Sequence, residues 1–385
     1  MSVNIFNILE IFSLLVIFIL VLTSLLRISK LFNISKEETL ILFLYHTILA
    51  LVFLFVDLNH GHDASGWYNR ARLNVNTYTG DSFMYFISGL FQFVGIKYLS
   101  QNMIFNYLGF LTLVIFYSKI KEFCLHHKKK QIFYVFVSLI FVPGFSFWTS
   151  GITKDVISIF GLAILYLSVN NKINVKLFIT AIIFIFLSRP FLLFFFGLSF
   201  LLYGIYLMII SNKLKLEIKL FLFFLIIFLL YSLILSTNFL SHYIQGFETT
   251  FNLIYIIEQI INYIKMSQTF YVQDTFGVPL DSNFYSRYFY FLFMPLKIDN
   301  DNLFLTYYLV ENIFLINLTL FMIFKFKYTP VKINYMCKVF YIGILLMFIY
   351  FPLAFSNYGI ALRYKWLIIP YFILAFLQFR VYRKN

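Results

Sequence analysis

The sequence predicts an all-α, polytopic integral membrane protein, and its composition is the first observation behind that prediction. Hydrophobic residues make up 62% of the 385 residues, charged residues only 12%, and the mean hydropathy is +0.87. Ordinary globular domains are about 45–50% apolar and about 25% charged. A chain with so few ionic groups cannot build a water-facing surface. We therefore expect a single transmembrane domain over 1–385 and exclude soluble, disordered and disulfide-stapled classes.

The second observation is a series of long apolar stretches. A spanning helix needs about 20 mostly apolar residues, because lipid offers no partners to backbone polar groups. Eleven stretches approach this length; the shortest is 176–187, which ends at Ser188-Arg189-Pro190. The predicted spans are 5–26, 39–57, 102–118, 132–148, 155–170, 176–187, 190–210, 219–236, 303–324, 337–354 and 366–380.

The third observation is the distribution of positive charge between these stretches. Positive residues stay on the cytoplasmic side of a membrane, and six connecting segments hold 20 of the 30 Lys and Arg. We expect a bacterial inner-membrane protein with a periplasmic N-terminus and a cytoplasmic C-terminus. Lys128-Lys129-Lys130 is then an orientation signal beside lipid headgroups, not a nucleic-acid patch. The cytoplasmic segments are 27–38, 119–131, 171–176, 211–219, 325–338 and 380–385.

Two details of the chain support this class. No cation precedes Arg27, so we expect the first apolar stretch to be retained as a helix and not cleaved as a signal peptide. The two cysteines, Cys124 and Cys337, both fall in predicted cytoplasmic segments, so no disulfide is expected. The high Phe, Ile, Lys and Asn content is typical of AT-rich coding and indicates a bacterial or horizontally acquired gene.

Polar residues collect in two long loops on the predicted periplasmic side. The first covers 57–101, and within it the aromatic stretch 83–98 is expected to lie in the membrane interface as a helix. The second covers 237–302, a length that is usually functional or has its own structure. Tyr and Trp in these loops suit sugar stacking, although an interfacial aromatic belt explains them equally well.

Cations in short turns on the same side run against the orientation rule, so each needs a reason. Lys154 has two structural explanations, a salt bridge to its neighbour Asp155 or snorkelling to the interface. Arg189 lies before Pro190 between two very apolar stretches, which favours a functional role. Arg363 is followed by Lys365, and both are equally well explained as interface anchors.

These residue types fit a substrate that combines a lipid tail, a pyrophosphate and a sugar. Arg matches phosphate oxygens with a planar fork of donors, and Lys supplies a point charge. A carboxylate or imidazole near the acceptor hydroxyl would act as base, and we assign that role to Asp63, His60 or His62. Trp67 and Tyr68 are candidate glycan-binding residues. No metal or cofactor is expected. The candidate pyrophosphate-binding residues are Arg70, Arg72, Lys154, Arg189, Arg287 and Arg363.

At these residues the chain resembles lipid-linked-sugar glycosyltransferases of the C-type superfamily. The resemblance rests on Asp63-Ala-Ser-Gly-Trp-Tyr68 followed by the segment from Gly80 to Phe93, and on the pieces 147–155, 188–190 and 363–365. Within that group the chain is most similar to bacterial O-antigen and exopolysaccharide polymerases of the Wzy/EpsG type. The likeness covers about two-thirds of the chain as a pattern. The second loop departs from it, because Arg287 is its one arginine.

The resemblance implies transfer of a growing glycan from undecaprenyl pyrophosphate to a lipid-linked repeat unit on the periplasmic face. The partners implied are undecaprenyl-pyrophosphate-linked oligosaccharide and membrane lipids, with a chain-length regulator and a flippase as protein partners, and no nucleic acid. Asp63 matches the early-loop acid, and Arg189 and Arg363 match outer-face cations.

Two other readings remain open. One is a C-type glycosyltransferase that uses a polyprenyl-phosphate sugar donor, for which Asp57 and Asp81 would be further loop acids. The other is a lipid-linked oligosaccharide flippase or transporter, which should show internal repeats and polar residues in mid-membrane. We find no repeat, and the clearly intramembrane acids, Glu10 and Glu311, both lie near the outer ends of their spans.

Overall fold

The chain is helical almost throughout the part that the computed structural model describes. That part comprises residues 8–60, 63–75, 78–126, 130–170, 173–210, 284–294, 303–328, 334–354 and 358–382. Within these ranges the one exception to helix and turn is a two-stranded antiparallel ribbon of β1 (Phe326–Tyr328) and β2 (Arg380–Tyr382). The prediction of an all-α membrane protein is confirmed at this level.

Within the described ranges, six helical stretches are long and apolar enough, by length and composition, to cross a membrane. The helices that carry them are α1 (Ile8–Leu31), α2 (Lys36–His60), α5 (Tyr98–His126), α10 (Pro190–Ile210) and α16 (Tyr335–Ala354), with the pair α17 (Tyr358–Lys365) and α18 (Ile369–Phe379) as the sixth. They coincide with six of the predicted spans. On α1, apolar side chains such as Phe12 and Ile19 are exposed, as expected of a face that meets lipid.

The other predicted spans are not among these six, so eleven crossings are not confirmed. The predicted span 132–148 is divided into α6 (Lys130–Ile140) and α7 (Pro143–Trp148). Proline disfavours helix at the residue before it and favours the first helical position, and Val142 is accordingly extended. The span 219–236 lies outside the described residues. Helices α8 (Lys154–Asn170) and α9 (Val175–Ser188) are shorter. Helix α15 (Leu303–Lys325) matches the predicted span 303–324, but its apolar part with described side chains, Tyr308–Phe324, is shorter than the other six.

The chain divides into two compact units. Unit 1 comprises Met1–Phe194, Leu296–Tyr341 and Trp366–Asn385, and unit 2 comprises Phe195–Pro295 and Ile342–Lys365. The expectation of one transmembrane domain stays a prediction.

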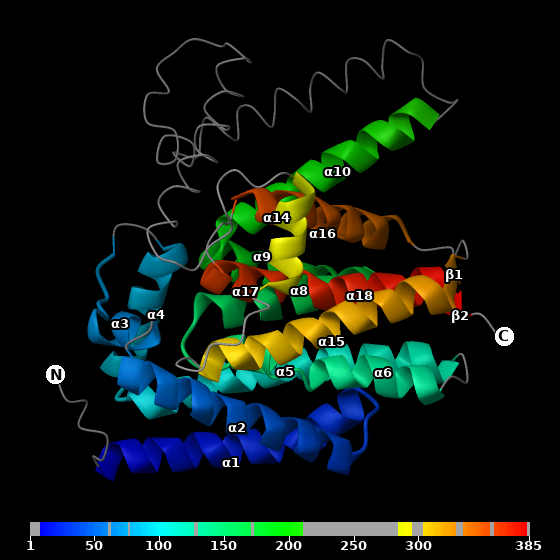
Figure 1. Cartoon of the computed structure of the whole chain (residues 1–385). Helices are drawn as coiled ribbons and strands as arrows, with labels where there is room; N and C mark the ends of the chain where they lie inside the picture. Colours follow the sequence, from blue (N-terminus) through cyan, green and yellow to red (C-terminus); the bar gives the residue numbers. More distant parts are fainter. Residues whose placement is uncertain are drawn as a thin grey trace, which may run out of the picture. The chain divides into compact units, whose positions relative to one another are not determined.

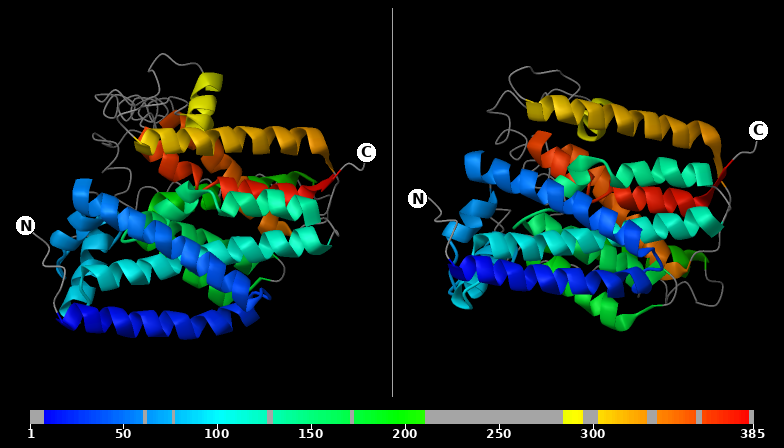
Figure 2. Two further views of the ribbon diagram at one scale, coloured as in Figure 1. Left: turned by 60° about the horizontal axis from the view of Figure 1, so that its bottom comes forward. Right: turned by 90° about the horizontal axis from the view of Figure 1, so that it is seen from below.

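Unit 1 is a bundle in which α1, α2, α5 and α6 lie side by side (Figure 1). Helix α8 packs on α5 and α9, and it is buried on nearly all sides. Two short helices, α3 (Asp63–Asn69) and α4 (Gly80–Phe93), cover one end of this bundle. In both views of Figure 2 they lie at the end away from β2. Helix α4 falls where an interfacial helix was expected; its position in the interface stays a prediction.

Each end of the α2–α5 pair is fixed by a carboxylate. At the start of α2, Glu38 accepts hydrogen bonds from Tyr117 (2.6 Å) and Lys121 (2.6 Å) of α5. At the other end of α2, the buried Asp57 accepts hydrogen bonds from the Tyr98 hydroxyl and from Ser65 Oγ at 3.4 Å. The two helices are therefore antiparallel, and α3 and α4 belong to the Asp57 end, opposite Glu38.

Unit 2 has a small aromatic core of its own. The Tyr288 hydroxyl of α14 (Phe284–Phe293) donates a hydrogen bond to the Ile349 carbonyl of α16 at 2.7 Å. The rings of Phe351 and Tyr364 meet edge to face with centroids 4.9 Å apart. Helix α14 also packs against α17.

Candidate functional site

The segment between α3 and α4 is tied to α4 by its backbone. The Arg72 N–H donates to the Tyr85 carbonyl at 3.2 Å, and the Arg72 guanidinium lies over the Tyr85 ring, 5.5 Å from its centroid. Gly89 makes this approach possible, because a Cβ there would stand 2.9 Å from the Arg72 backbone. Arg72 itself is exposed, so one of the predicted phosphate-binding cations lies accessible beside α4.

Lys154 joins α8 to α4 at this end of unit 1. Its Nζ donates to Asp81 Oδ1 at 2.7 Å and lies 5.9 Å from the centre of the Trp67 ring. The Lys154 side chain is 24% exposed and that of Asp81 is 56% exposed. Surface pairs of this kind contribute little to stability, about 0–1 kcal/mol. We name the three residues Trp67, Asp81 and Lys154 the lysine cluster.

The first turn of α8 also holds a buried ion pair. Asp155 Oδ1 accepts a hydrogen bond from Arg189 Nη2, and both side chains are at most 5% exposed. Thr153 caps the helix, because its Oγ1 accepts from the Val156 N–H at 3.2 Å. The expected alternative of a Lys154–Asp155 salt bridge is wrong. Consecutive residues on a helix do not face each other, so Lys154 pairs with Asp81 while Asp155 pairs with Arg189.

Beside that pair, the helices α8 and α9 are joined by a second polar contact. Ser158 Oγ donates to Ser188 Oγ at 3.0 Å, and both residues are buried. Arg189, predicted to bind pyrophosphate, is therefore held inside the protein by Asp155 at the junction of α9 and α10. Lys154 and Arg72 are more accessible to solvent than Arg189. Arg70, directly after α3, is also exposed.

The structure describes the three predicted bases to different extents. Asp63 begins α3 and its side chain is exposed. His60 ends α2, but its side chain is not among those described, and His62 lies outside the described residues. Among the described residues no group of three or more His, Cys, Asp or Glu could hold a metal ion.

The two predicted glycan-binding residues are packed within unit 1. Trp67 is 5% exposed beneath Lys154. The Tyr68 ring meets the Tyr98 ring edge to face at 5.1 Å, and its carbonyl accepts a hydrogen bond from Gln92 at 2.7 Å. Burial, and then the charge of Glu10, raise the pKa of the Tyr68 phenol. A ring as covered as Trp67 presents little surface to a sugar.

The remaining predicted cations belong to unit 2. Arg287 lies on α14 and Arg363 on α17, and these two helices pack together. Burial lowers the pKa of the Arg287 guanidinium. Lys365, at the end of α17, is fully buried.

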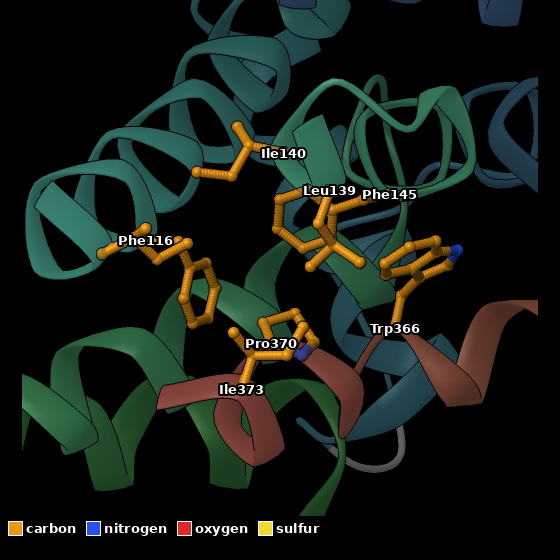
Figure 3. A pocket seen from close by; sticks show the side chains of 8 residues that line it. Phe116, Leu139, Ile140, Phe145, Trp366, Pro370 and Ile373 are labelled. Atoms are coloured by element: carbon orange, nitrogen blue, oxygen red, sulfur yellow. The ribbon is translucent and has the colours of Figure 1, made fainter. Parts of the chain in front are cut away.

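An apolar pocket lies elsewhere in unit 1, among α5, α6, α7 and α18 (Figure 3). Its lining is hydrocarbon and aromatic, so it offers nothing to a phosphate or a sugar. The lining residues are Phe116, Ile120, Leu139, Ile140, Phe145, Trp366, Pro370 and Ile373.

Sequence reasoning named Asp81 only as a further loop acid of the alternative glycosyltransferase and Asp155 only as a neighbour of Lys154. It did not single out Tyr85. The positions of these three residues depend on contacts between residues 13 to 73 apart in the chain. One signal was available: cations on the side that the orientation rule disfavours need carboxylate partners. Asp81 and Asp155 are the acidic residues in the turns next to these cations.

Comparisons with protein-family profiles, with curated proteins and with solved structures gave no match for this chain. The fold and composition define its class, an all-helical membrane protein.

Proposed function

We propose that this protein is a bacterial inner-membrane glycosyltransferase of the polysaccharide-polymerase kind. It would transfer a growing glycan from undecaprenyl pyrophosphate to a lipid-linked repeat unit on the periplasmic face. The single observation that carries the proposal is the lysine cluster. It offers a partly exposed ammonium group, with a carboxylate in contact, at one end of a membrane bundle.

The proposed transfer requires a cation and a carboxylate at one end of the membrane bundle. The leaving group is a lipid diphosphate, whose charge grows as the glycosidic bond breaks. A cation aimed at developing negative charge stabilises the transition state. Lys154 is positioned for this role by the first turn of α8, and Arg72 packs against Tyr85 of the neighbouring α4. An N-terminal helix end adds favourable potential for an anion.

Lys154→Gln tests the proposal in purified protein held in lipid nanodiscs. The substrate would be the lipid-linked repeat units extracted from a strain that lacks this gene, and products would be resolved as a ladder. We expect the variant to lose at least about 100-fold in rate, the size of effect seen when one transition-state donor is removed.

Lys119→Gln is the matched control. Lys119 forms a similar pair with Glu122 at 2.6 Å, on α5. This variant should keep wild-type activity, because Lys119 lies toward the Glu38 end of α5. A wild-type protein that forms no glycosidic bond from this lipid extract would contradict the proposal. Single-sugar products without a ladder would favour the C-type glycosyltransferase with a polyprenyl-phosphate donor.

A flippase for lipid-linked oligosaccharide is the second candidate, and one observation favours it. His46, near the middle of α2, is a fully buried ionisable residue. Ionisable residues at membrane depth often mark transport pathways. Transbilayer movement of the extracted lipid in proteoliposomes, lost on His46→Leu and without product formation, would support this function in place of the first.

A further inference from the structure

Among the residues that the structure describes, four aspartates lie at the α3–α4 end of unit 1, and they differ in burial and in their partners. Asp57 is buried and accepts hydrogen bonds from Tyr98 and Ser65. Asp155 is buried against Arg189. Asp63 and Asp81 are both exposed, each in the first turn of a helix. A group that takes a proton from a bound substrate must be reachable, so the buried pair are unsuited to this role.

Asp81 contacts a candidate phosphate-binding cation. Its Oδ1 accepts from Lys154 Nζ at 2.7 Å while 56% of its side chain remains exposed. A donor pyrophosphate bound at Lys154 would therefore bring its sugar close to this carboxylate. Gly80, with φ of +61°, starts α4 directly before Asp81 and sets the direction in which the helix leaves the loop.

We propose that Asp81 is the catalytic base of the transfer, held by Lys154 until the substrate pyrophosphate takes its place. This inference rests on the proposed function. Asp81 accepts the proton of the acceptor hydroxyl as that oxygen forms its bond to the anomeric carbon. The bond from that carbon to the diphosphate oxygen breaks, and undecaprenyl pyrophosphate leaves with the electron pair, next to the Lys154 ammonium.

The exchange of partners follows from charge and exposure. A diphosphate carries more negative charge than one carboxylate and presents several acceptor oxygens, so it competes well for a lysine that is already partly in water. Lys makes no fixed fork and can swing between acceptors on its flexible stem. Release from Lys154 leaves the Asp81 carboxylate free of that donor when the acceptor hydroxyl arrives.

Asp81→Asn is the variant that tests this assignment, measured with the nanodisc preparation and lipid extract described above. We expect kcat to fall by about 10²–10⁴-fold, the usual contribution of a general base, with no rise in KM for the lipid-linked unit. Added formate should restore part of the rate in Asp81→Ala but not in Lys154→Gln, because formate can occupy the space of a deleted carboxylate and not of a deleted ammonium.

Glu122→Gln is the matched control. Glu122 is 52% exposed and pairs with a lysine at 2.6 Å, as Asp81 does, but toward the Glu38 end of α5. It should keep wild-type kcat and KM.

Two results would overturn the assignment while leaving the proposed function intact. Wild-type kcat in Asp81→Asn would exclude Asp81 as the base. A raised KM with little change in kcat, as expected if Asp81 merely holds Lys154 in place, would make it a positioning residue. Failure of the proposed function is distinguishable, because the wild-type protein itself would then form no product.

Discussion

At the scale of single residues, the structure separates cations that the sequence treats alike. Arg189 and Lys154 both lie in turns on the predicted periplasmic side. Arg189 is 5% exposed and paired with Asp155, whereas Lys154 is 24% exposed and paired with Asp81. Breaking a buried ion pair costs much free energy, whereas breaking a surface pair costs little. A substitution at Arg189 should therefore lower the stability of the protein, whereas a substitution at Lys154 should mainly lower its activity.

Arg189→Met should destabilise the protein, because it leaves the Asp155 carboxylate buried without its cation. We expect a loss of about 3–5 kcal/mol in the free energy of unfolding. The double variant Asp155→Leu/Arg189→Met should recover most of that loss, since similar apolar volume replaces both charges. Thermal unfolding of the purified variants in detergent measures both effects. Equal destabilisation by the single and double variants would show that the ion pair is not what Arg189 contributes.

At the scale of secondary-structure elements, glycines decide how closely the pieces of unit 1 approach. Gly80 and Gly95 flank α4 with positive φ angles of +61° and +83°. Gly109 on α5 faces the turn after α7: a Cβ at this position would stand 1.8 Å from the Thr149 carbonyl oxygen and 2.6 Å from His46 Nε2. The first two glycines provide backbone freedom and the third provides space.

Gly80→Ala should lower transfer activity more than it lowers stability. A side chain at positive φ costs about 1–2 kcal/mol, and the backbone at Gly80 aims Asp81 at Lys154. Gly95→Ala carries the same strain at the other end of the helix, and neither position has atoms within 4 Å of the added Cβ. Unfolding temperature and transfer rate are compared for the two variants. An equal loss of transfer rate in both variants would mean that activity depends on the position of α4 as a whole and not on the direction of Asp81.

Gly109→Ala should destabilise the bundle by about 3 kcal/mol, the upper range for overpacking. The obstacle is a backbone carbonyl, which cannot move aside as a flexible side chain can. Gly204→Ala on α10 is the control, since a Cβ there meets nothing within 4 Å, and it should gain about 0.5–1 kcal/mol. Unfolding midpoints of the two variants check both signs. A neutral Gly109→Ala would contradict the packing of α5 against Thr149.

At the scale of the whole molecule, the antiparallel α2–α5 pair gives unit 1 two chemically different ends. One end carries Glu38 with Lys121, and the other carries the lysine cluster with α3 and α4. A one-sided reaction on a lipid-linked substrate needs such an asymmetry. The orientation in the membrane is the remaining element of the proposal, and labelling can test it.

Cysteines introduced at Asn69 and Glu37 should react from opposite sides of the membrane. Both positions are exposed, one at the end of α3 and the other at the start of α2, and the native Cys124 and Cys337 are buried. In spheroplasts, a membrane-impermeant maleimide should label Asn69→Cys at once and Glu37→Cys only after permeabilisation. The reverse pattern would place the lysine cluster in the cytoplasm and remove the periplasmic reaction.

The sequence by itself determined the class of this protein and the positions of most of its helices. Hydropathy and length are local properties, and lipid enforces them strongly, so six predicted spans recur as helices long enough to cross. The break at Pro143 lowered the count of long helices. The effect of proline on a helix is also local. The residues on both sides of Val142 are apolar, however, so hydropathy predicts one continuous span there.

Only the tertiary structure decided which charges meet. Lys154 pairs with Asp81, 73 positions away, and not with its neighbour Asp155, which pairs with Arg189 instead. Trp67 is covered by Lys154, although composition offered it as a sugar platform. Side-chain partners depend on how helices rotate and where short helices fold back, and no local property of the chain encodes these choices.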